Sequence, residues 1–278
     1  MIPKIIHYCW FGGNPLPESA VKCINSWKKF FPDYEIWAWV ETNLTPNPSP
    51  TGEGSLQQKY LADEVMEFDV NVIPYTREAY EARKFAFVSD YARFDILYQY
   101  GGIYFDTDVE VIKSMDEIVE RGPFMGIEVD SPNPSIAPLV APGLGLGATI
   151  RMPFYKSVLD YYEHLHFLTE EGKPNNITVV KHTTNVLTAN GMKNENTLQE
   201  VCGVWIYPKE YFNPLNDNTG KLDITENTRS IHWYTKTWLD KRNPVRDWIV
   251  KRIHRYFGIN SLVWLKNINI DFVKRFNI

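Results

Sequence analysis

The first forty residues alternate strand, helix and strand patterns, and this order limits the fold more than any other feature of the sequence. Residues 2–10 form an apolar run that ends at Gly12-Gly13, which predicts a buried strand. Apolar residues at helical spacing predict a helix over 18–31, and residues 34–40 predict a second strand. Strand–helix–strand units are typical of parallel sheets, so we expect an α/β protein with a mostly parallel central sheet flanked by helices.

The composition supports one substantial hydrophobic core. Hydrophobic residues make up 44% of the 278 residues and charged residues 23%, values that exclude a disordered chain. The cysteines Cys9, Cys23 and Cys202 are widely spaced and include no CxxC pair, so neither a zinc site nor a disulfide scaffold is indicated. No cleavage site follows the N-terminal apolar run and no stretch is long enough to span a bilayer, so we expect a cytoplasmic protein with reduced thiols.

A short strand that ends in two aspartates follows a long helical pattern. Residues 77–100 have apolar side chains at spacings of three and four, which predicts one helix that ends at Gly101-Gly102. Residues 103–105 predict a short buried strand, and Asp106 and Asp108 come directly after it. On an extended chain these two carboxylates point the same way.

Two aspartates separated by one residue form a compact anionic site that suits a hard cation, Mg²⁺ or Mn²⁺. Such a cation can neutralise the charge that develops on a nucleoside diphosphate leaving group. The same spacing also arises by chance in surface turns that cap a helix or face solvent. We expect Asp106 and Asp108 to be exposed, so that they repel each other without a cation. The change Asp108→Ala should then preserve or raise the melting temperature while it removes metal-dependent activity.

The surroundings of the two aspartates carry a specific pattern. Residues 89–111 (SDYARFDILYQYGGIYFDTDVEV) contain S-D-x-x-R and, after a helix end, G-G-x-Y-x-D-x-D. This pattern resembles glycosyltransferase family 32, the DxD-containing sugar transferases. The opening IPKIIHYCWFGG and the segment SIHWYTKTW at 230–238 are also similar to the family, although Thr237 stands at a position usually occupied by a small residue. The resemblance covers most of residues 2–240 and implies the GT-A type of nucleotide-sugar transferase fold.

The resemblance implies metal and catalytic roles. Asp108 would bind Mn²⁺ or Mg²⁺ directly, and Asp106 would contact the metal, the donor ribose or both. His232 lies in an apolar run, where a histidine is usually structural, but its place in the 230–238 segment implies a third contact to the metal or the diphosphate. His7 lies inside the first predicted strand, and there we favour a structural role. The catalytic residues implied are Asp90, Arg93, Asp106 and Asp108.

The resemblance also implies a set of donor contacts. Asp90 and Arg93, one helical turn apart, would hold the sugar hydroxyls, although by themselves they would be interpreted as a surface ion pair. The Tyr104 hydroxyl would approach the donor, and Trp10 would stack on the nucleobase beyond the carboxyl end of the first strand. Trp238 would close over the donor. The donor-binding residues implied are Trp10, Asp90, Arg93, Tyr104, Asp106 and Trp238.

The expected activity is that of a retaining, metal-dependent glycosyltransferase in cell-surface polysaccharide synthesis, of the capsule or lipopolysaccharide kind. It would move a hexose from a nucleotide-sugar donor, a UDP-hexose or GDP-mannose, to a glycan or lipid-linked acceptor. No carboxylate in the motifs is an obvious covalent nucleophile, so we expect front-face attack assisted by the departing phosphate. Two other classes stay open: a metal-dependent nucleotidyltransferase or phosphatase, and an inactive sugar-binding module on the same fold.

The chain divides into an acidic body and a basic tail. Residues 241–278 contain nine Lys and Arg against two acids, a balance of +7, so the net charge of -5 leaves -12 on residues 1–240. We interpret 1–240 as the transferase domain, with a surface insertion near 44–67, and 241–278 as a helical extension. The amphipathic helix over 245–257 lies on an anionic membrane surface, at the inner face of the cell membrane, or packs back on the domain, or does both, with only its basic side facing lipid. The charges do not indicate a nucleic-acid partner.

Overall fold

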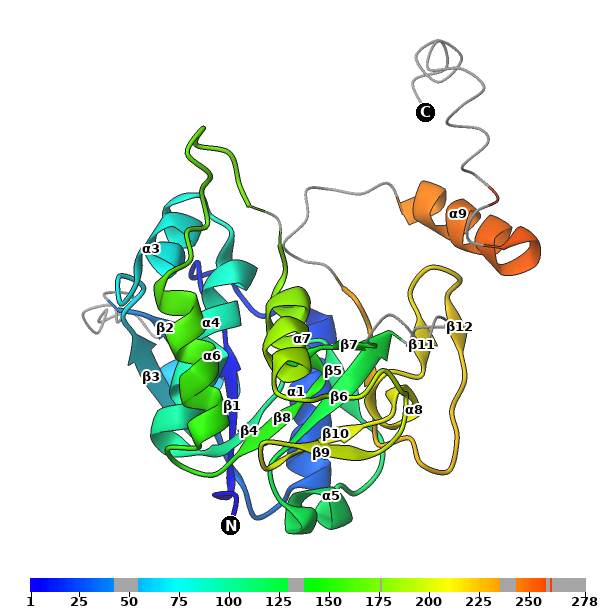
Figure 1. Ribbon diagram of the computed structural model, residues 1–278. Helices are drawn as coiled ribbons and strands as arrows, with labels where there is room; N and C mark the ends of the chain where they lie inside the picture. The colour runs from blue at the N-terminus through cyan, green and yellow to red at the C-terminus, as the bar shows by residue number, and fades with distance from the viewer. Residues whose placement is uncertain (43–54, 130–137, 176, 236–243, 259–260, 262–278) are drawn as a thin grey trace.

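The computed structural model describes residues 1–42, 55–129, 138–175, 177–235, 244–258 and 261 (Figure 1). Within these residues, nine strands form a central sheet in the order β3-β2-β1-β4-β8-β6-β10-β9, with β7 paired to β6. All of them run in one direction except β7, β8 and β9. The strands are β1 (Ile5–Cys9), β2 (Glu35–Glu41), β3 (Glu64–Phe68), β4 (Gly102–Tyr104), β6 (Phe124–Val129), β7 (Leu139–Val140), β8 (Leu146–Ala148), β9 (Gln199–Val201) and β10 (Val204–Tyr207).

Helices cover both faces of this sheet, which confirms the predicted α/β architecture. One face packs against α1, where Trp27 is fully buried next to Phe105. The other face packs against α4 and α6, where Phe94 and Tyr155 are in contact. The helices are α1 (Glu18–Phe30), α2 (Leu56–Tyr60), α3 (Pro74–Glu81), α4 (Phe85–Tyr100), α5 (Asp116–Arg121), the 3-10 helix η1 (Pro142–Leu144), α6 (Pro153–Glu163), α7 (Val179–Ala189), α8 (Lys209–Phe212) and α9 (Pro244–Phe257).

The order of the strands reverses at β1, and this reversal creates the crevice of the fold. Strand β1 pairs in parallel with β2 on one side and with β4 on the other, so that Ile6 lies opposite both Ile36 and Ile103. The chain moves outward from β1 to β3 and then returns to β4. The loops that follow β1 and β4 therefore run in opposite directions and form a crevice at the carboxyl ends of these strands. Open α/β sheets bind ligands in such a crevice.

His7 lies at the centre of the sheet and has a structural role. Its Nε2 donates to the carbonyl of Gly101 at 2.9 Å, and its Nδ1 accepts from the Trp39 indole at 3.1 Å. Burial lowers the pKa of His7 to about 4, so the ring is neutral and both nitrogens have a partner. The imidazole therefore joins β1 to β2 and to the turn before β4.

Two shorter pairs of strands lie outside the central sheet. Strand β5 (Val109–Val111) pairs antiparallel with β13 (Ser230–His232), so that His232 lies opposite Val109. Strands β11 (Leu215–Asn216) and β12 (Lys221–Leu222) form a hairpin. The β5–β13 ladder brings the end of the domain back to the two aspartates.

The prediction of one helix over 77–100 is wrong, because the chain turns between α3 and α4. The Arg83 amide donates to Tyr80 O at 2.9 Å and the Lys84 amide to Ala79 O at 2.8 Å, the two bonds of a Schellman cap. Arg83 takes the left-handed conformation, with φ 56°, that glycine usually occupies in this cap. Since no glycine marks this position, the sequence pattern contains no stop signal.

The predicted surface insertion near 44–67 is wrong in its second half. Residues 43–54 lie outside the described part of the chain. Helix α2 begins at a capping box made by Ser55 and Gln58, and β3 then pairs with β2 as the edge of the central sheet. Tyr60 and Ala62 are buried, so this segment completes the core rather than lying on its surface.

Helix α9 matches the helix predicted over 245–257. Among the helices that the structure describes, none has both the length and the apolar character needed to cross a bilayer.

We expect Gly102→Ala to be strongly destabilising. Gly102 has φ +98°, and a Cβ there would lie 2.6 Å from Ile5 O and 3.0 Å from His7 Nε2. The matched control is Gly191→Ala, where φ is +91° but nothing lies within 4 Å of the added atom. In urea unfolding, Gly102→Ala should cost about 2–3 kcal/mol and Gly191→Ala about 1 kcal/mol. Equal losses would show that the β1–β4 approach is not tight.

Candidate functional site

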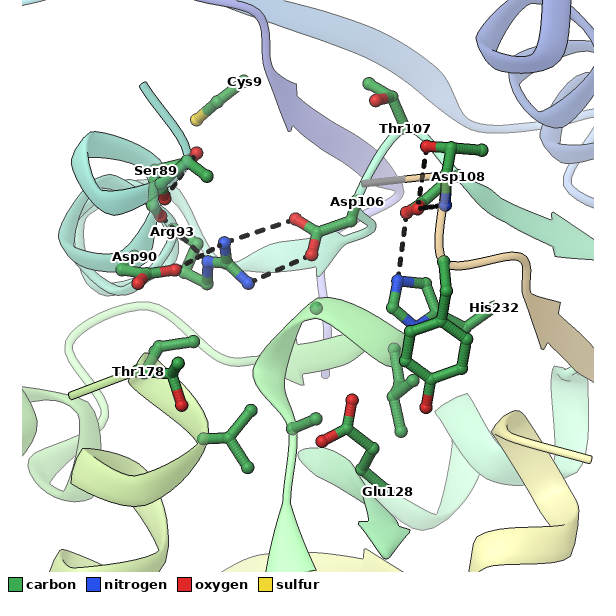
Figure 2. A pocket seen from close by; sticks show the side chains of 18 of the residues that line it. Cys9, Ser89, Asp90, Arg93, Asp106, Thr107, Asp108, Glu128, Thr178 and His232 are labelled. Carbon is green, nitrogen blue, oxygen red and sulfur yellow. Dashed lines mark hydrogen bonds and ion pairs between the residues drawn. The ribbon is translucent and has the colours of Figure 1, made fainter. Parts of the chain in front are cut away.

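The two aspartates lie in a turn directly after β4, at the carboxyl edge of the sheet. The expectation of an extended chain is wrong, because the Val109 amide donates back to Asp106 O at 3.0 Å. The Asp106 amide donates to Gly143 O at 3.1 Å, and a Cβ at Gly143 would overlap the Asp106 carboxylate. Both carboxylates nevertheless face one cavity (Figure 2).

Asp108 is held by the segment that follows β13. Its Oδ1 lies 3.0 Å from His232 Nε2, and its Oδ2 accepts from the Thr235 amide at 2.9 Å and from the Thr235 hydroxyl at 3.1 Å. The Trp233 amide donates to Asp108 O at 3.0 Å. More than a hundred residues separate Asp108 from this segment in the sequence, and the β5–β13 ladder brings the two together.

These contacts shift the pKa of both Asp108 and His232. Burial alone would raise the pKa of Asp108, but the charge of His232 and the bonds from His232 and Thr235 outweigh it and hold the pKa at about 2. Burial would lower the pKa of His232, and Asp108 raises it above its ordinary value. The Asp108 side chain is 15% exposed, so the expectation of an exposed, repelling pair is wrong.

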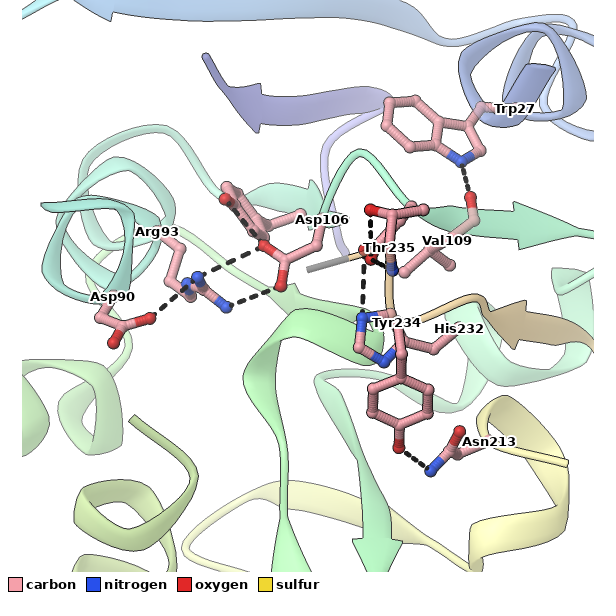
Figure 3. Close-up of polar contacts among 11 residues, drawn as sticks. Trp27, Asp90, Arg93, Asp106, Val109, Asn213, His232, Tyr234 and Thr235 are labelled. Carbon is pink, nitrogen blue, oxygen red and sulfur yellow. Dashed lines mark hydrogen bonds and ion pairs between the residues drawn. The ribbon is translucent and has the colours of Figure 1, made fainter. Parts of the chain in front are cut away.

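Asp106 belongs to a second chain of charges that runs into the protein (Figure 3). Arg93 Nη2 lies 3.3 Å from Asp106 Oδ1 and 3.1 Å from Asp90 Oδ1, so one guanidinium serves two carboxylates. The Tyr104 hydroxyl donates to Asp106 at 3.2 Å, and Arg93 Nε donates to Ser89 O at 2.8 Å. Tyr104 therefore reaches Asp106 from β4.

Asp90 and Arg93 are not a surface ion pair. Their side chains are 10% and 4% exposed, respectively. Burial raises the pKa of Asp90 to about 7, although Arg93 opposes the shift. Burial alone would lower the pKa of Arg93, but Asp106, Tyr104 and Asp90 outweigh it and raise the value, so the guanidinium stays charged. The inner end of the cavity thus holds a fixed cation beside a carboxyl group that can change its protonation near neutral pH.

The cavity has a volume of about 950 Å³, a size typical of small-molecule sites. Its walls come from the carboxyl ends of three parallel strands: Trp10 follows β1, Asp106 follows β4, and Glu128 lies at the end of β6. Trp10 is partly buried and its indole donates to Asn14 O at 2.7 Å. Trp238 lies outside the described residues.

Comparison with known proteins identifies the type of domain. Residues 17–125 match the family described as "Glycosyltransferase sugar-binding region containing DXD motif". Over these residues the chain is similar to the sugar-binding region of DXD-type glycosyltransferases. This match confirms the family-level prediction that the motifs support.

The glycosyltransferase domain is similar to parts of longer curated proteins. Inositol phosphoceramide mannosyltransferase 1 of Schizosaccharomyces pombe is 26% identical over 60% of this chain and 45% of its own length. Inositol phosphoceramide mannosyltransferase 3 of the same yeast is 30% identical over 42% of this chain and 27% of its own length. The chain therefore spans less than half of these relatives.

One solved structure is matched over nearly the whole length of both chains. It is that of a galactosyltransferase, LgtC, in complex with donor and acceptor sugar analogs, and it is 13% identical. It covers 98% of this chain and 99% of its own, with a TM-score of 0.47.

The cavity contains a group of side chains that fits a divalent cation. One ligand atom each of Asp106, Asp108 and His232 lies within 4.8 Å of the others. Two carboxylates and an imidazole suit Mn²⁺ well and Mg²⁺ through the carboxylates. Among the residues that the structure describes, the buried His232 Nδ1 has no hydrogen-bond partner, so the ring can turn without breaking another of these bonds. A bound cation would replace the His232–Asp108 ion pair.

The sequence motifs do not indicate two further residues of the site, Thr235 and Glu128. Thr235 lies inside the 230–238 segment, but its bonds to Asp108 depend on the left-handed turn at Tyr234, with φ 51°. Glu128 stands on the cavity wall that faces the two aspartates (Figure 2). Its position at the carboxyl end of a parallel strand is the one signal that could have indicated it.

We expect Asp108→Asn to destabilise the protein when no divalent cation is present, contrary to the sequence-based expectation for Asp108→Ala. The loss of charge-assisted bonds from His232 and Thr235 should lower the free energy of unfolding by about 1–2 kcal/mol at pH 6. The folded-state pKa of Asp108 is lowered, so its contribution is present above about pH 4 and disappears as the pH falls toward 2.

The folded-state pKa of His232 is raised, so its contribution is present below its ordinary pKa and disappears as the pH rises through the higher folded value. The difference between the two proteins should therefore be largest between about pH 4 and 6.5. Urea unfolding in EDTA at pH 6 and pH 9 measures this, and an Asn variant as stable as the parent at pH 6 would contradict it.

Proposed function

We propose that this protein, with a GT-A type domain, uses a divalent cation to transfer a hexose from a nucleoside-diphosphate donor to a glycan or lipid-linked acceptor. The observation that carries the proposal is the presence of two groups in one cavity. Asp106, Asp108 and His232 form a cation-type cluster, and the buried Asp90–Arg93 pair lies directly behind Asp106. A nucleotide sugar needs both, because its diphosphate is anionic and its sugar presents hydroxyl groups.

The donor would lie along the carboxyl edge of the sheet. Trp10 offers a partly buried ring at the outer end, where a nucleobase can stack. The diphosphate would lie at the DxD turn, where a bound cation would balance its charge. Asp90 and Arg93 would contact the sugar hydroxyls at the inner end. The Arg93 donors and the Asp90 carboxyl offer hydrogen bonds of both kinds there.

In the reaction, the bond between sugar C1 and the phosphate oxygen breaks, and C1 bonds to the acceptor oxygen. The acceptor proton moves to the departing phosphate, which leaves as the nucleoside diphosphate. We infer retention by front-face attack, since this route requires no protein nucleophile. Glu128 is a carboxylate on the facing wall and offers the alternative of a covalent intermediate.

The acceptor is proposed to be lipid-linked and to serve cell-surface polysaccharide synthesis in the cytoplasm. Two observations support this proposal. Two relatives are named as mannosyltransferases of inositol phosphoceramide, which is a lipid. The mouth of the cavity is also bordered by the β11–β12 hairpin, which α9 contacts.

The products of donor hydrolysis separate the proposed activity from its alternatives. Incubation with UDP-galactose, UDP-glucose, a UDP-N-acetylhexosamine and GDP-mannose, with Mn²⁺ or EDTA, should yield a nucleoside diphosphate and free sugar from one donor. A nucleotidyltransferase or phosphatase would instead cleave a phosphorus–oxygen bond and release a nucleoside monophosphate or inorganic phosphate. A sugar-binding module would bind a donor and release nothing.

We expect Asp106→Asn and Asp108→Asn each to lower kcat for Mn²⁺-dependent donor hydrolysis by at least about 10², because each removes a charge at the diphosphate. Asp33→Asn is the matched control, since Asp33 is 78% exposed and pairs only with Lys4 in the described residues. The variants should stay folded at pH 7.5 by circular dichroism. A folded Asp108→Asn protein with near-normal activity would exclude the proposed site.

The change Glu128→Gln tests the route of retention. With front-face attack, kcat for donor hydrolysis should fall by less than about tenfold, because the amide keeps the size and polarity of the wall. A covalent nucleophile would show a fall of more than about 10³, together with a glycosylated Glu128 peptide in the parent protein by mass spectrometry.

A further inference from the structure

Helix α9 is attached to the domain through its basic side. Figure 1 shows it beside the β11–β12 hairpin. Lys251 Nζ lies 3.1 Å from Asp217 Oδ1. Arg255 donates from Nε to Thr219 O at 3.2 Å and from Nη2 to Gly220 O at 2.6 Å. Two cationic groups of α9, those of Lys251 and Arg255, therefore bind the turn of the hairpin.

The apolar side of α9 points away from the domain. Trp248, Ile249, Tyr256 and Phe257 are 56%, 45%, 73% and 76% exposed. At 100° per residue, these four spread over about half of the helix circumference, and Lys251 and Arg255 lie in the other half, with Arg255 next to Trp248. The alternative in which the apolar side packs back on the domain is thus wrong for the described residues.

We propose that this side of α9, named the aromatic face and made of Trp248, Ile249, Tyr256 and Phe257, inserts into the interface of an anionic lipid bilayer. Aromatic and aliphatic side chains on one side of a helix suit that depth. Arg252 is exposed within the face, between Trp248 and Tyr256, with its guanidinium 4.3 Å from the centre of the Trp248 ring. An arginine there can bind lipid phosphates while its stem covers the indole.

The charge of the tail favours lipid over a second copy of the chain. Residues 241–278 have a balance of +7, so two tails would repel each other, whereas an anionic surface attracts them. This assignment differs from one based on helical periodicity alone, which would direct all the basic residues of the helix to lipid. In the structure, Lys251 and Arg255 bind the hairpin instead.

The same arrangement connects the lipid surface to the cavity. Asn216, Asp217 and Asn218 of the hairpin line the cavity, and Asp217 is also the partner of Lys251. Helix α9 thus holds one wall of the cavity on its basic side and presents the aromatic face on the other. That a lipid-linked acceptor enters the cavity by this route rests on the proposed function. The contact between α9 and the membrane does not depend on that function.

The test is co-sedimentation of the full-length protein with vesicles of phosphatidylcholine alone or with 30% phosphatidylglycerol, without donor or acceptor. The parent protein should bind the anionic vesicles more tightly, and added salt should weaken binding. Replacing Trp248, Tyr256 and Phe257 together by Ser should weaken binding at least about tenfold, because the inserted side chains are lost. The matched control replaces Val72, Ile150 and Ile224, which are also exposed, by Ser. These changes should alter vesicle binding by less than about twofold.

Two neighbouring cations provide the sharper comparison. Arg252→Ala should weaken binding about fivefold, and Lys251→Ala less than about twofold, because only Arg252 faces the lipid. Equal effects of the two changes would overturn the assigned orientation. Equal binding by the parent and the triple Ser variant, or self-association of the parent without vesicle binding, would overturn the membrane contact. Donor hydrolysis measured in solution reports separately on the proposed function.

Discussion

The parallel pairing of β1 with both β2 and β4 positions the rest of the site. It places Trp10 and Asp106 at neighbouring strand ends, on either side of the point where the strand order reverses. His7 holds this junction together because its buried neutral ring bonds to β2 and to the turn before β4. Gly102 is required at the same junction, since a side chain would collide with β1.

The negative charges of the site are balanced within the protein. Arg93 lies between Asp106 and Asp90, while His232 and Thr235 hold Asp108. A carboxylate cluster of this kind would otherwise destabilise the folded chain by mutual repulsion and by loss of solvation. The domain can therefore fold with its ligands already in place, and a cation would compete with His232 for Asp108.

Segments distant in the sequence complete the cavity. The β5–β13 ladder brings Thr235 to Asp108, and β6 brings Glu128 to the facing wall. The hairpin that borders the cavity is in turn bound by Lys251 and Arg255 of α9. The ends of the strands form the floor of the cavity, whereas part of its border is the β11–β12 hairpin, which α9 contacts through polar groups.

The sequence by itself determined the α/β class, the first three elements and the carboxylates of the site, because strand and helix periodicity and the motif around Asp106 and Asp108 are local signals. It could not show that Arg83 ends a helix without a glycine, or that residues 64–68 form an edge strand, because these depend on bonds to distant backbone. The burial of Asp90 and Asp108, the approach of Thr235 and Glu128, and the outward direction of the aromatic face were decided by tertiary structure alone. Each depends on which segments pack together, and a charge or an apolar side chain has no fixed environment until that packing exists.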